Sequence, residues 1–202
     1  KDNTVKEPLI PANAKLKGSK VKTVAHNDIL GTTEWTLKNG IKVIVKPTTF
    51  KADEVIVNAT MHAGLSNIGD ADYNTANFLP TLVGSMGVSK FSATDLRKQL
   101  SGKSASVSLG TDDFETEVYG SGSPKDLETL LQLEYLYFTA PRFDKNDFDV
   151  TLNKYRSYVE NLKTNPDFIM QSEFVKTLYN DNPRKQQIST EMLNSISFER
   201  LP

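Results

Sequence analysis

Few residues of this sequence have the chemistry to bind a metal ion or to act as a nucleophile. Its 202 residues include no cysteine, and the only histidines are His26 and His62. A four-coordinate zinc site normally includes at least one His or Cys besides carboxylates, so the candidate ligands are His62 with Asp70 or Asp72. However, the alternation of residues 55–62 places His62 on a mixed, wetter face of a strand, where a single histidine is usually a solvated side chain. We therefore predict that this chain holds no metal site.

The lack of reactive groups extends to the amphipathic helix that the sequence predicts over residues 72–86. A helix that follows a strand and lies over a sheet is a common position for a zinc-binding His-x-x-Glu-His motif. The five positions where such a motif is expected read Asn77-Phe78-Leu79-Pro80-Thr81, without a His or a Glu. This helix therefore has the setting of a catalytic helix but none of its chemical groups. A nucleophile elbow of the form G-x-S-x-G is also absent from the sequence.

The composition argues against two broad classes of partner. The 24 Lys and Arg residues are balanced by 25 Asp and Glu residues, which gives a net charge of −1. This balance offers no electrostatic reason to expect nucleic acid or an anionic membrane as a partner. No apolar run approaches the roughly 18 residues that suggest a membrane-spanning helix. The chain starts without a signal-like segment and stops abruptly at Leu201-Pro202, so we expect it to be a piece of a longer protein.

The N-terminal region, residues 1–33, has the composition of a linker. Pro8, Pro11 and Gly18 interrupt it, and it shows no sustained apolar periodicity, which predicts an extended segment. We therefore divide the chain into a linker over residues 1–33 and a domain over residues 34–202.

The domain is expected to begin with three strands. Asn39-Gly40 lies between two β-rich runs, 33–37 and 41–45, and is a strong signal for a hairpin. A third strand is predicted over residues 55–63, directly before the helix.

Within the helix over 72–86, either Asp70 or Asp72 is the expected N-cap. Pro80 should kink the helix by more than about 20° or interrupt it, because proline removes a backbone hydrogen bond. Five residues at helical spacing are predicted to face the core: Ala76, Leu79, Leu82, Val83 and Met86.

Two further strands, over residues 103–109 and 114–119, are predicted to share a polar face without an apolar side chain that needs burial. This face is formed by Ser104, Ser106, Ser108, Glu115 and Glu117.

The other predicted helices start at capping residues, namely Ser92, Ser123, Asp144 or Asn146, and Asn165-Pro166. Their apolar stripes are interpreted as core, including Phe168, Phe174, Val175 and Leu178 of the last helix. The order of elements predicts an α+β fold, with helices packed on one face of a mostly antiparallel sheet.

With these elements in place, the sequence resembles the insulinase/pitrilysin zinc peptidases, called the M16 family, over about residues 33–202. The predicted helix at 72–86 also lies where this family has a helix. The residues that carry the resemblance are Leu37-x-Asn39-Gly40-x-x-Val43, Ala63-Gly64-Leu65-Ser66, Gly87-Val88 with the Ser92 cap, Leu131-Gln132-Leu133-x-Tyr135-Leu136-Tyr137-Phe138, Asn165-Pro166 and Asn182-Pro183-Arg184. The fold that this resemblance implies is the LuxS/MPP-like metallohydrolase fold.

The resemblance also implies which positions would carry the chemistry. In active members both His residues of His-x-x-Glu-His bind zinc, the Glu between them is the general base, and a Glu on a later helix is the third ligand. Carried over to this sequence, the two His positions are Asn77 and Thr81, the base is Pro80, and the third ligand is Tyr158. None of these residues can hold the metal or activate its water at neutral pH.

Long members of the family contain four related domains, of which the third is a degenerate copy of the zinc-binding first. By resemblance, this chain is such a third-domain-like, noncatalytic copy, and residues 1–33 are the linker between the two halves. The parent protein would then be a zinc metalloendopeptidase with zinc in another domain. The partners implied are other M16 domains of the same polypeptide and a peptide substrate.

The polar strand face formed by Ser104, Ser106, Ser108, Glu115 and Glu117 is the candidate lining of the substrate chamber. The alternative function is a structural or binding module that assembles with partner domains and has no connection with proteolysis. The resemblance favours a periplasmic or cell-envelope location, although a sequence without cysteine suits the cytoplasm equally.

Overall fold

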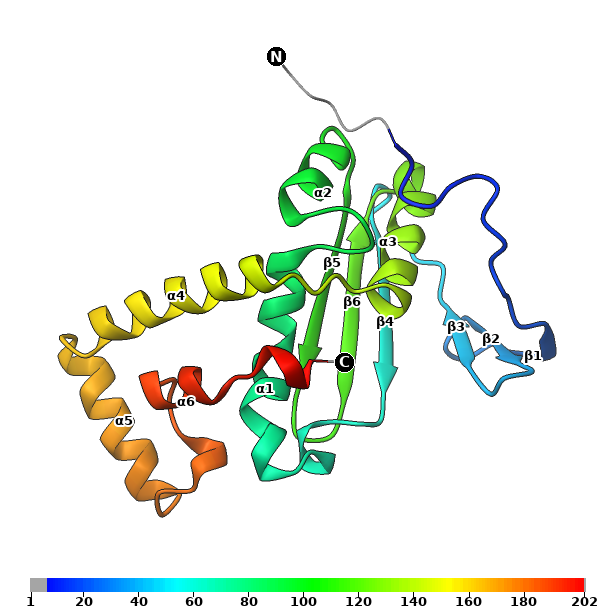
Figure 1. The fold of residues 1–202 in the computed structure, drawn as a ribbon. Coiled ribbons are helices and arrows are strands. Elements are labelled where there is room, and N and C mark those ends of the chain that lie inside the picture. The colour runs from blue at the N-terminus through cyan, green and yellow to red at the C-terminus, as the bar shows by residue number, and fades with distance from the viewer. Residues whose placement is uncertain (1–6, 202) are drawn as a thin grey trace.

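Two antiparallel sheets of three strands each form the β part of residues 7–201, which this computed structural model describes (Figure 1). The small sheet, with strand order β1-β2-β3, contains β1 (Val21–Asn27), β2 (Thr32–Leu37) and β3 (Lys42–Val45). The central sheet, with order β4-β6-β5, contains β4 (Val55–Met61), β5 (Ala105–Thr111) and β6 (Thr116–Gly122). The sequence predicted a single sheet, so the division into two is a difference from the prediction.

Helices make up most of the remaining chain. The α-helices are α1 (Asp70–Met86), α2 (Ala93–Gln99), α3 (Leu127–Thr139), α4 (Lys145–Leu162), α5 (Pro166–Leu178) and α6 (Thr190–Ser195). Four single turns of 3-10 helix are η1 (Leu65–Asn67), η2 (Pro124–Asp126), η3 (Pro183–Lys185) and η4 (Phe198–Arg200). The predicted α+β class is confirmed.

The region predicted to be a linker contains a β-strand. Residues 1–6 lie outside the described residues, but β1 occupies 21–27 and pairs with β2 along its length. All seven residues of β1 are exposed, so the strand has no apolar periodicity toward a core. That missing periodicity is the signal on which the sequence analysis depended, which explains why the strand was not found.

The hairpin between β2 and β3 is confirmed. The Leu37 N–H donates to the Ile41 carbonyl at 2.8 Å, and the Gly40 N–H donates to the Leu37 carbonyl at 3.0 Å. Gly40 has φ +92°, a conformation that glycine adopts without steric cost. The turn therefore forms where the Asn39-Gly40 pair predicted it.

Helices cover one face of the central sheet. Helices α1 and α3 both pack against β5, and α3 also packs against β6. Side chains alternate along the strands, so Val107 and Val118 point toward these helices while Ser106, Ser108 and Glu117 point away. The sheet therefore has one covered face and one open face, as predicted.

The hydrophobic core has two clusters of buried residues. The first joins α1, α4 and α6 and contains Phe78, Leu82, Met86, Phe148, Leu152, Val159, Leu193 and Ile196. The second lies around α2 and α3 and contains Leu9, Val88, Phe91, Leu96, Leu133 and Leu136. Leu9 belongs to the second cluster, so part of the predicted linker is packed against the domain.

Helix α1 differs from its prediction in three respects. Gly69 is its N-cap, and Asp70 and Asp72 lie in the first turn, where carboxylates interact favourably with the helix dipole. Phe78 instead of Leu79 faces the core. The helix also continues through Pro80, so the predicted interruption is wrong, while the alternative of a kink stays a prediction.

The N-terminal end of α1 is held by Arg184. Its guanidinium donates to the carbonyls of Leu65 at 3.3 Å and Ile68 at 2.7 Å, and it pairs with Asp70 at 2.5 Å. It also lies over the Tyr73 ring, 4.7 Å from the centroid. A single side chain thus fixes the turn that leads into the helix.

Two further arginines act on α1. Arg200 forms an ion pair with Asp72 in the first turn. At the other end, Arg142 donates to the Met86 carbonyl at 3.0 Å, where a cation is favoured by the helix dipole. Both ends of α1 are therefore tied to segments that come later in the chain.

Helix α5 was predicted to contribute to the core, but it does not. None of its residues is buried, and Phe174 and Leu178 are 63% and 60% exposed. Its N-cap is the predicted Asn165, whose side chain accepts from the N–H groups of Asp167 and Phe168. The start of the helix was predictable from the capping residue, whereas its burial depends on what packs against it.

Candidate functional site

The four positions at which the resemblance places zinc chemistry lie on α1 and α4, which pack against each other. Asn77 and Tyr158 are exposed, and Pro80 and Thr81 are half-buried. The four positions thus lie on two helices that are in contact.

Aromatic rings fill the contact between α1 and α4 beside these positions. The Phe78 and Tyr155 rings meet edge to face with centroids 4.9 Å apart, and Tyr155 meets Tyr158 in the same way at 6.5 Å. Such pairs stabilise the contact beyond the burial of their area. The contact between the two helices is therefore apolar packing in a region where a metal centre would need polar ligands.

The residues at the four positions do not fit a zinc ion. The Pro80 side chain has no donor atom, and the side chains of Asn77, Thr81 and Tyr158 are neutral groups, whereas structural and catalytic zinc is bound by His, Cys or carboxylate. Within residues 7–201, no group of three or more His, Cys, Asp or Glu side chains is placed to hold a metal ion. We derive no metal-dependent step from this chain.

His62 has a partner that the sequence analysis missed. Its Nδ1 lies 2.9 Å from the Glu115 carboxylate oxygen Oε1, at the end of the central sheet where β4 finishes. Glu115 directly precedes β6 and lies at the end of the open face instead of within its strands. The signal that could have found the pair is the turn before β6, where the Asp112 side chain accepts from the N–H groups of Phe114 and Glu115.

The open face of the central sheet contains most of the predicted polar residues. Ser106 and Ser108 are exposed on β5 and Glu117 is exposed on β6, while Ser104 lies just before β5. Strand register places Ser108 beside Tyr119 and Ser106 beside Ser121. These side chains form one continuous surface.

The open face is less polar than predicted. Ile56 is 56% exposed on β4 and Tyr119 is 44% exposed on β6, and register places Ile56 beside Ser121 and Tyr119 beside Asn58. The predicted set of serines and glutamates therefore describes only part of this face. A surface that mixes hydroxyls, one carboxylate, an aromatic ring and an aliphatic side chain can contact an extended peptide through both hydrogen bonds and apolar contacts.

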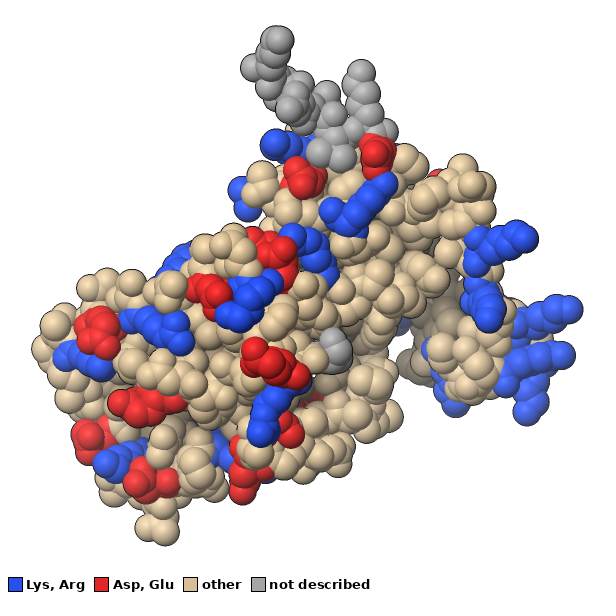
Figure 2. Space-filling view, viewed as in Figure 1, with Lys and Arg blue, Asp and Glu red and all other residues tan. Residues whose placement is uncertain are grey.

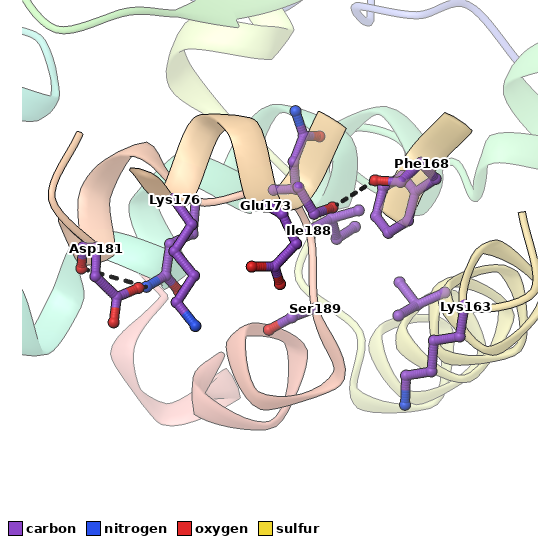
Figure 3. A pocket seen from close by; sticks show the side chains of 11 residues that line it. Lys163, Phe168, Glu173, Lys176, Asp181, Ile188 and Ser189 are labelled. Atoms are coloured by element: carbon purple, nitrogen blue, oxygen red, sulfur yellow. Dashed lines mark hydrogen bonds between the residues drawn. The ribbon is translucent and has the colours of Figure 1, made fainter. Parts of the chain in front are cut away.

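A hollow of about 220 Å³ lies between α4, α5 and the segment before α6 (Figure 3). The Glu173 carboxylate points into it, with Lys176 and Lys163 on either side in this view. Two of its lining residues are joined by a hydrogen bond that Gln186 donates to the Asp181 carboxylate at 2.9 Å. None of the predicted site residues lines this hollow, and its walls combine charges of both signs.

Charge is distributed unevenly between the two parts of the surface. Figure 2 shows acidic and basic side chains interspersed over the helical part, whereas the region of the small sheet is mainly basic. The sequence there contains Lys20, Lys22, Lys38, Lys42 and Lys46. Lys42 pairs with Glu34 at 3.0 Å.

Comparison with protein families and curated proteins gives one informative relative. No family model matches the sequence. The chain is 30% identical over 110 residues to a "Zinc protease PQQL-like" protein from Arabidopsis thaliana, which covers 54% of the chain and 9% of that protein.

Solved structures give broader coverage. The periplasmic protease PqqL from Escherichia coli matches 96% of the chain with a TM-score of 0.75 at 15% identity. A peptidase M16 inactive domain from Pseudomonas fluorescens matches 82% with a TM-score of 0.62 at 18% identity. The predicted resemblance therefore extends to the structure, since the chain has the fold of a peptidase M16 inactive domain and of the protease PqqL.

The chain spans only a small part of these similar proteins. It corresponds to 21% of the PqqL chain and 42% of the Pseudomonas fluorescens chain. Proteins with this fold therefore contain further polypeptide beside the part that matches. No helix within residues 7–201 is both long enough and apolar enough to cross a membrane.

Proposed function

We propose that this chain is a noncatalytic domain of an M16-family zinc metalloendopeptidase and that it forms part of the wall of the substrate chamber. Zinc would be held by another domain of the same polypeptide. The partners of the chain are these other M16 domains and a peptide substrate.

One observation carries the proposal. The chain has the fold of M16 domains, yet Asn77, Pro80, Thr81 and Tyr158 stand at the positions where zinc ligands and the general base are expected. A domain that keeps the architecture without the ligands contributes surface and not chemistry. The inactive M16 domain among the similar structures is a precedent for such a domain.

The open face of the central sheet is the proposed lining of the chamber. It is the side of the sheet away from α1 and α3, and it exposes Ser106, Ser108 and Glu117 together with Tyr119. Peptide recognition combines a few directed polar groups with apolar contact, and this face offers both. Glu115 is a weaker candidate, because its carboxylate already lies beside His62.

An experiment on the parent protein tests the lining. Glu117→Lys should change the relative cleavage rates of peptides with basic and acidic residues, because it reverses the charge on the face they contact. The matched control is Glu128→Lys, on the exposed side of α3, which should change neither these ratios nor the zinc content. If both variants leave all the ratios unchanged, the chamber role should be replaced by a purely structural one.

A second candidate function is a structural or binding module that assembles with partner domains and is unrelated to proteolysis. The exposed apolar side chains of α5, Phe174 and Leu178, favour a packing role. The two functions differ in one readout, since only the first requires an active zinc domain in the parent polypeptide. We also propose a periplasmic or cell-envelope location for the parent, on the basis of the similarity to the periplasmic protease PqqL.

A further inference from the structure

The small sheet has no core of its own within the described residues. Each residue of β1, β2 and β3 is exposed or only half-buried, and these strands make their main packing contacts with one another. In Figure 1 the small sheet stands apart from the helices, on the β4 side of the central sheet. A three-stranded sheet needs a covered apolar face to be stable, so the small sheet requires further contacts.

The side chains on one face of the small sheet show where such contacts are needed. Strand register aligns Val24 with Trp35 and Trp35 with Val43, which places the three in a row on the same face. The period of two residues adds Leu37 and Val45 to this face. Val24 is 54% exposed and Val45 is 39% exposed. This apolar face has no cover in residues 7–201.

The edge of β3 has unpaired backbone groups that can be identified from the hairpin. The Leu37 N–H donates to the Ile41 carbonyl, and hydrogen-bonded pairs in an antiparallel ladder recur at every second residue. Val43 and Val45 therefore bond to β2. The backbone N–H and carbonyl groups of Lys42 and Ile44 point to the open edge.

The outer edge of β4 also has unpaired backbone groups. The Ser123 N–H donates to the Ser104 carbonyl at 2.9 Å, which fixes the residues of β6 that bond to β5. The intervening residues of β6 bond to β4. Their partners on β4 are Val55, Val57, Ala59 and Met61. The backbone groups of Ile56, Asn58 and Thr60 are left at the open edge.

We propose that one further β-strand, supplied by polypeptide of the same protein outside residues 1–202, inserts between β3 and β4 and joins the two sheets into one. The two open edges belong to β3, the last strand before the link 46–54, and to β4, the first strand after it. An inserted strand needs two strand spacings of about 4.8 Å each, which a link of this length spans when extended at about 3.3 Å per residue.

The source of the strand follows from the similar structures. The chain corresponds to 21% and 42% of two of them, so polypeptide beyond the matched part is available in proteins of this fold. The lysines around the small sheet favour acidic residues on the segment that covers it. The inference rests on the proposed function only in requiring a longer protein that contains these residues.

Site-resolved hydrogen exchange of the parent protein, without added peptide, tests the inserted strand. We expect the amides of Lys42, Ile44 and Asn58 to exchange more than about a hundredfold slower than in an unstructured peptide. Val43 and Val57 are internal controls, because their amides already bond within the existing sheets. Fast exchange at the three edge amides beside slow exchange at the two controls would overturn the proposal.

Two proline variants of the parent provide a second measurement. Ile44→Pro removes an N–H from the proposed pairing edge, and His26→Pro removes an outward N–H from β1, at the opposite edge of the same sheet. Proline is tolerated at sheet edges. We expect Ile44→Pro to accelerate exchange of residues 56–60 by at least about tenfold, with no change in His26→Pro. Equal effects of the two variants would contradict an inserted strand.

Other occupants of the gap give different results. Protection of the edge amides that is lost on dilution would identify a second copy of the protein, and protection that appears only with a peptide would identify substrate. Either result overturns the proposal. These experiments do not measure zinc content or peptide specificity. The inserted strand can therefore be disproved while the proposed function holds, and the proposed function can be disproved while the inserted strand holds.

Discussion

Glu134 is the one buried carboxyl group whose environment leaves it without a partner among the described residues. It lies on α3, it is only 8% exposed, and no hydrogen-bond partner is present for its Oε1. Its carboxyl group lies against Gly120 of β6, where a side chain at residue 120 would meet it. Burial raises the pKa of the Glu134 carboxyl above the ordinary glutamate value.

The raised pKa of Glu134 predicts a pH-dependent stability. The folded chain binds this proton more tightly than the unfolded chain, so the stabilisation is complete below the ordinary pKa and is lost as the pH rises through the raised pKa. Glu134→Gln cannot lose a proton. Its free energy of unfolding relative to the natural chain should therefore increase between about pH 4 and about pH 7 in denaturant titrations.

The control for this prediction is Glu128→Gln, which removes a negative charge from an exposed position of the same helix. It reports the general effect of one lost charge. If the difference between Glu134→Gln and the natural chain stays constant over this pH range, the Glu134 carboxyl has a partner or a path to solvent.

Arg184 combines an ion pair, two hydrogen bonds to carbonyl oxygens and stacking on Tyr73. Arg184→Ala leaves these carbonyl groups without their donor, and it should lower the free energy of unfolding by about 1–3 kcal/mol. Arg97→Ala, on the exposed side of α2, should change it by less than about 0.5 kcal/mol. Denaturant titration compares the two. A loss as small in Arg184→Ala as in the control would mean that water replaces the guanidinium at low cost.

At the scale of elements, α1 persists although it contains a proline. Pro80 lacks the N–H that would bond to the carbonyl four residues earlier, and proline in a helix interior normally costs about 3 kcal/mol. Pro80→Ala should therefore raise the free energy of unfolding, by about 1–3 kcal/mol, measured by thermal or denaturant unfolding.

Gly84→Ala calibrates this prediction within the same helix. An added side-chain carbon at Gly84 meets no other atom, and replacing a helical glycine should stabilise the chain by about 1 kcal/mol. A decrease in stability of Pro80→Ala beside an increase in Gly84→Ala would show that the half-buried proline ring makes packing contacts that alanine does not replace.

Local signals in the sequence predicted several elements whose backbone is determined by a single residue or pair, although not the N-cap of α1, which is Gly69. Asn39-Gly40 placed the hairpin, and the side chains of Ser92, Asp144 and Asn165 cap α2, α4 and α5 as expected. These interactions involve residues three positions apart or fewer, so they can be identified without knowing the fold.

The remaining elements depend on contacts between distant segments. Strand β1 is held by its pairing with β2 and has no buried face. The exposure of α5 and the pair of His62 with Glu115 are equally non-local. The predicted site rests on residue type at four positions of α1 and α4, whereas the mixed character of the open face required the strand register.

At the scale of the whole molecule, restoring the motif should not restore a zinc site. The triple variant Asn77→His, Pro80→Glu and Thr81→His supplies two ligands and a base, but Tyr158 still withholds the third ligand. We expect less than one zinc per chain after removal of loosely bound metal and no cleavage of a fluorogenic peptide library. The measurements are metal analysis and a peptidase assay.

A fourth substitution is the control for this prediction. Adding Tyr158→Glu provides a third ligand and should increase zinc affinity at least about tenfold over the triple variant. Chelator-sensitive peptide cleavage by the triple variant would contradict this prediction, because it would show that the restored motif needs neither the third ligand nor another domain.

The ion pairs that Arg184 and Arg200 form with α1 also determine when this helix is stabilised during synthesis. Arg184 and Arg200 come 114 and 128 positions after the aspartates with which they pair. At a synthesis rate of about 5–20 residues per second, Arg184 emerges between about 6 and 23 seconds after Asp70. During this interval the two carboxylates of the first turn lack their arginine partners. Helix α1 therefore begins early and is secured late, and a ribosomal pause before Arg184 would lengthen the time during which its first turn can fray.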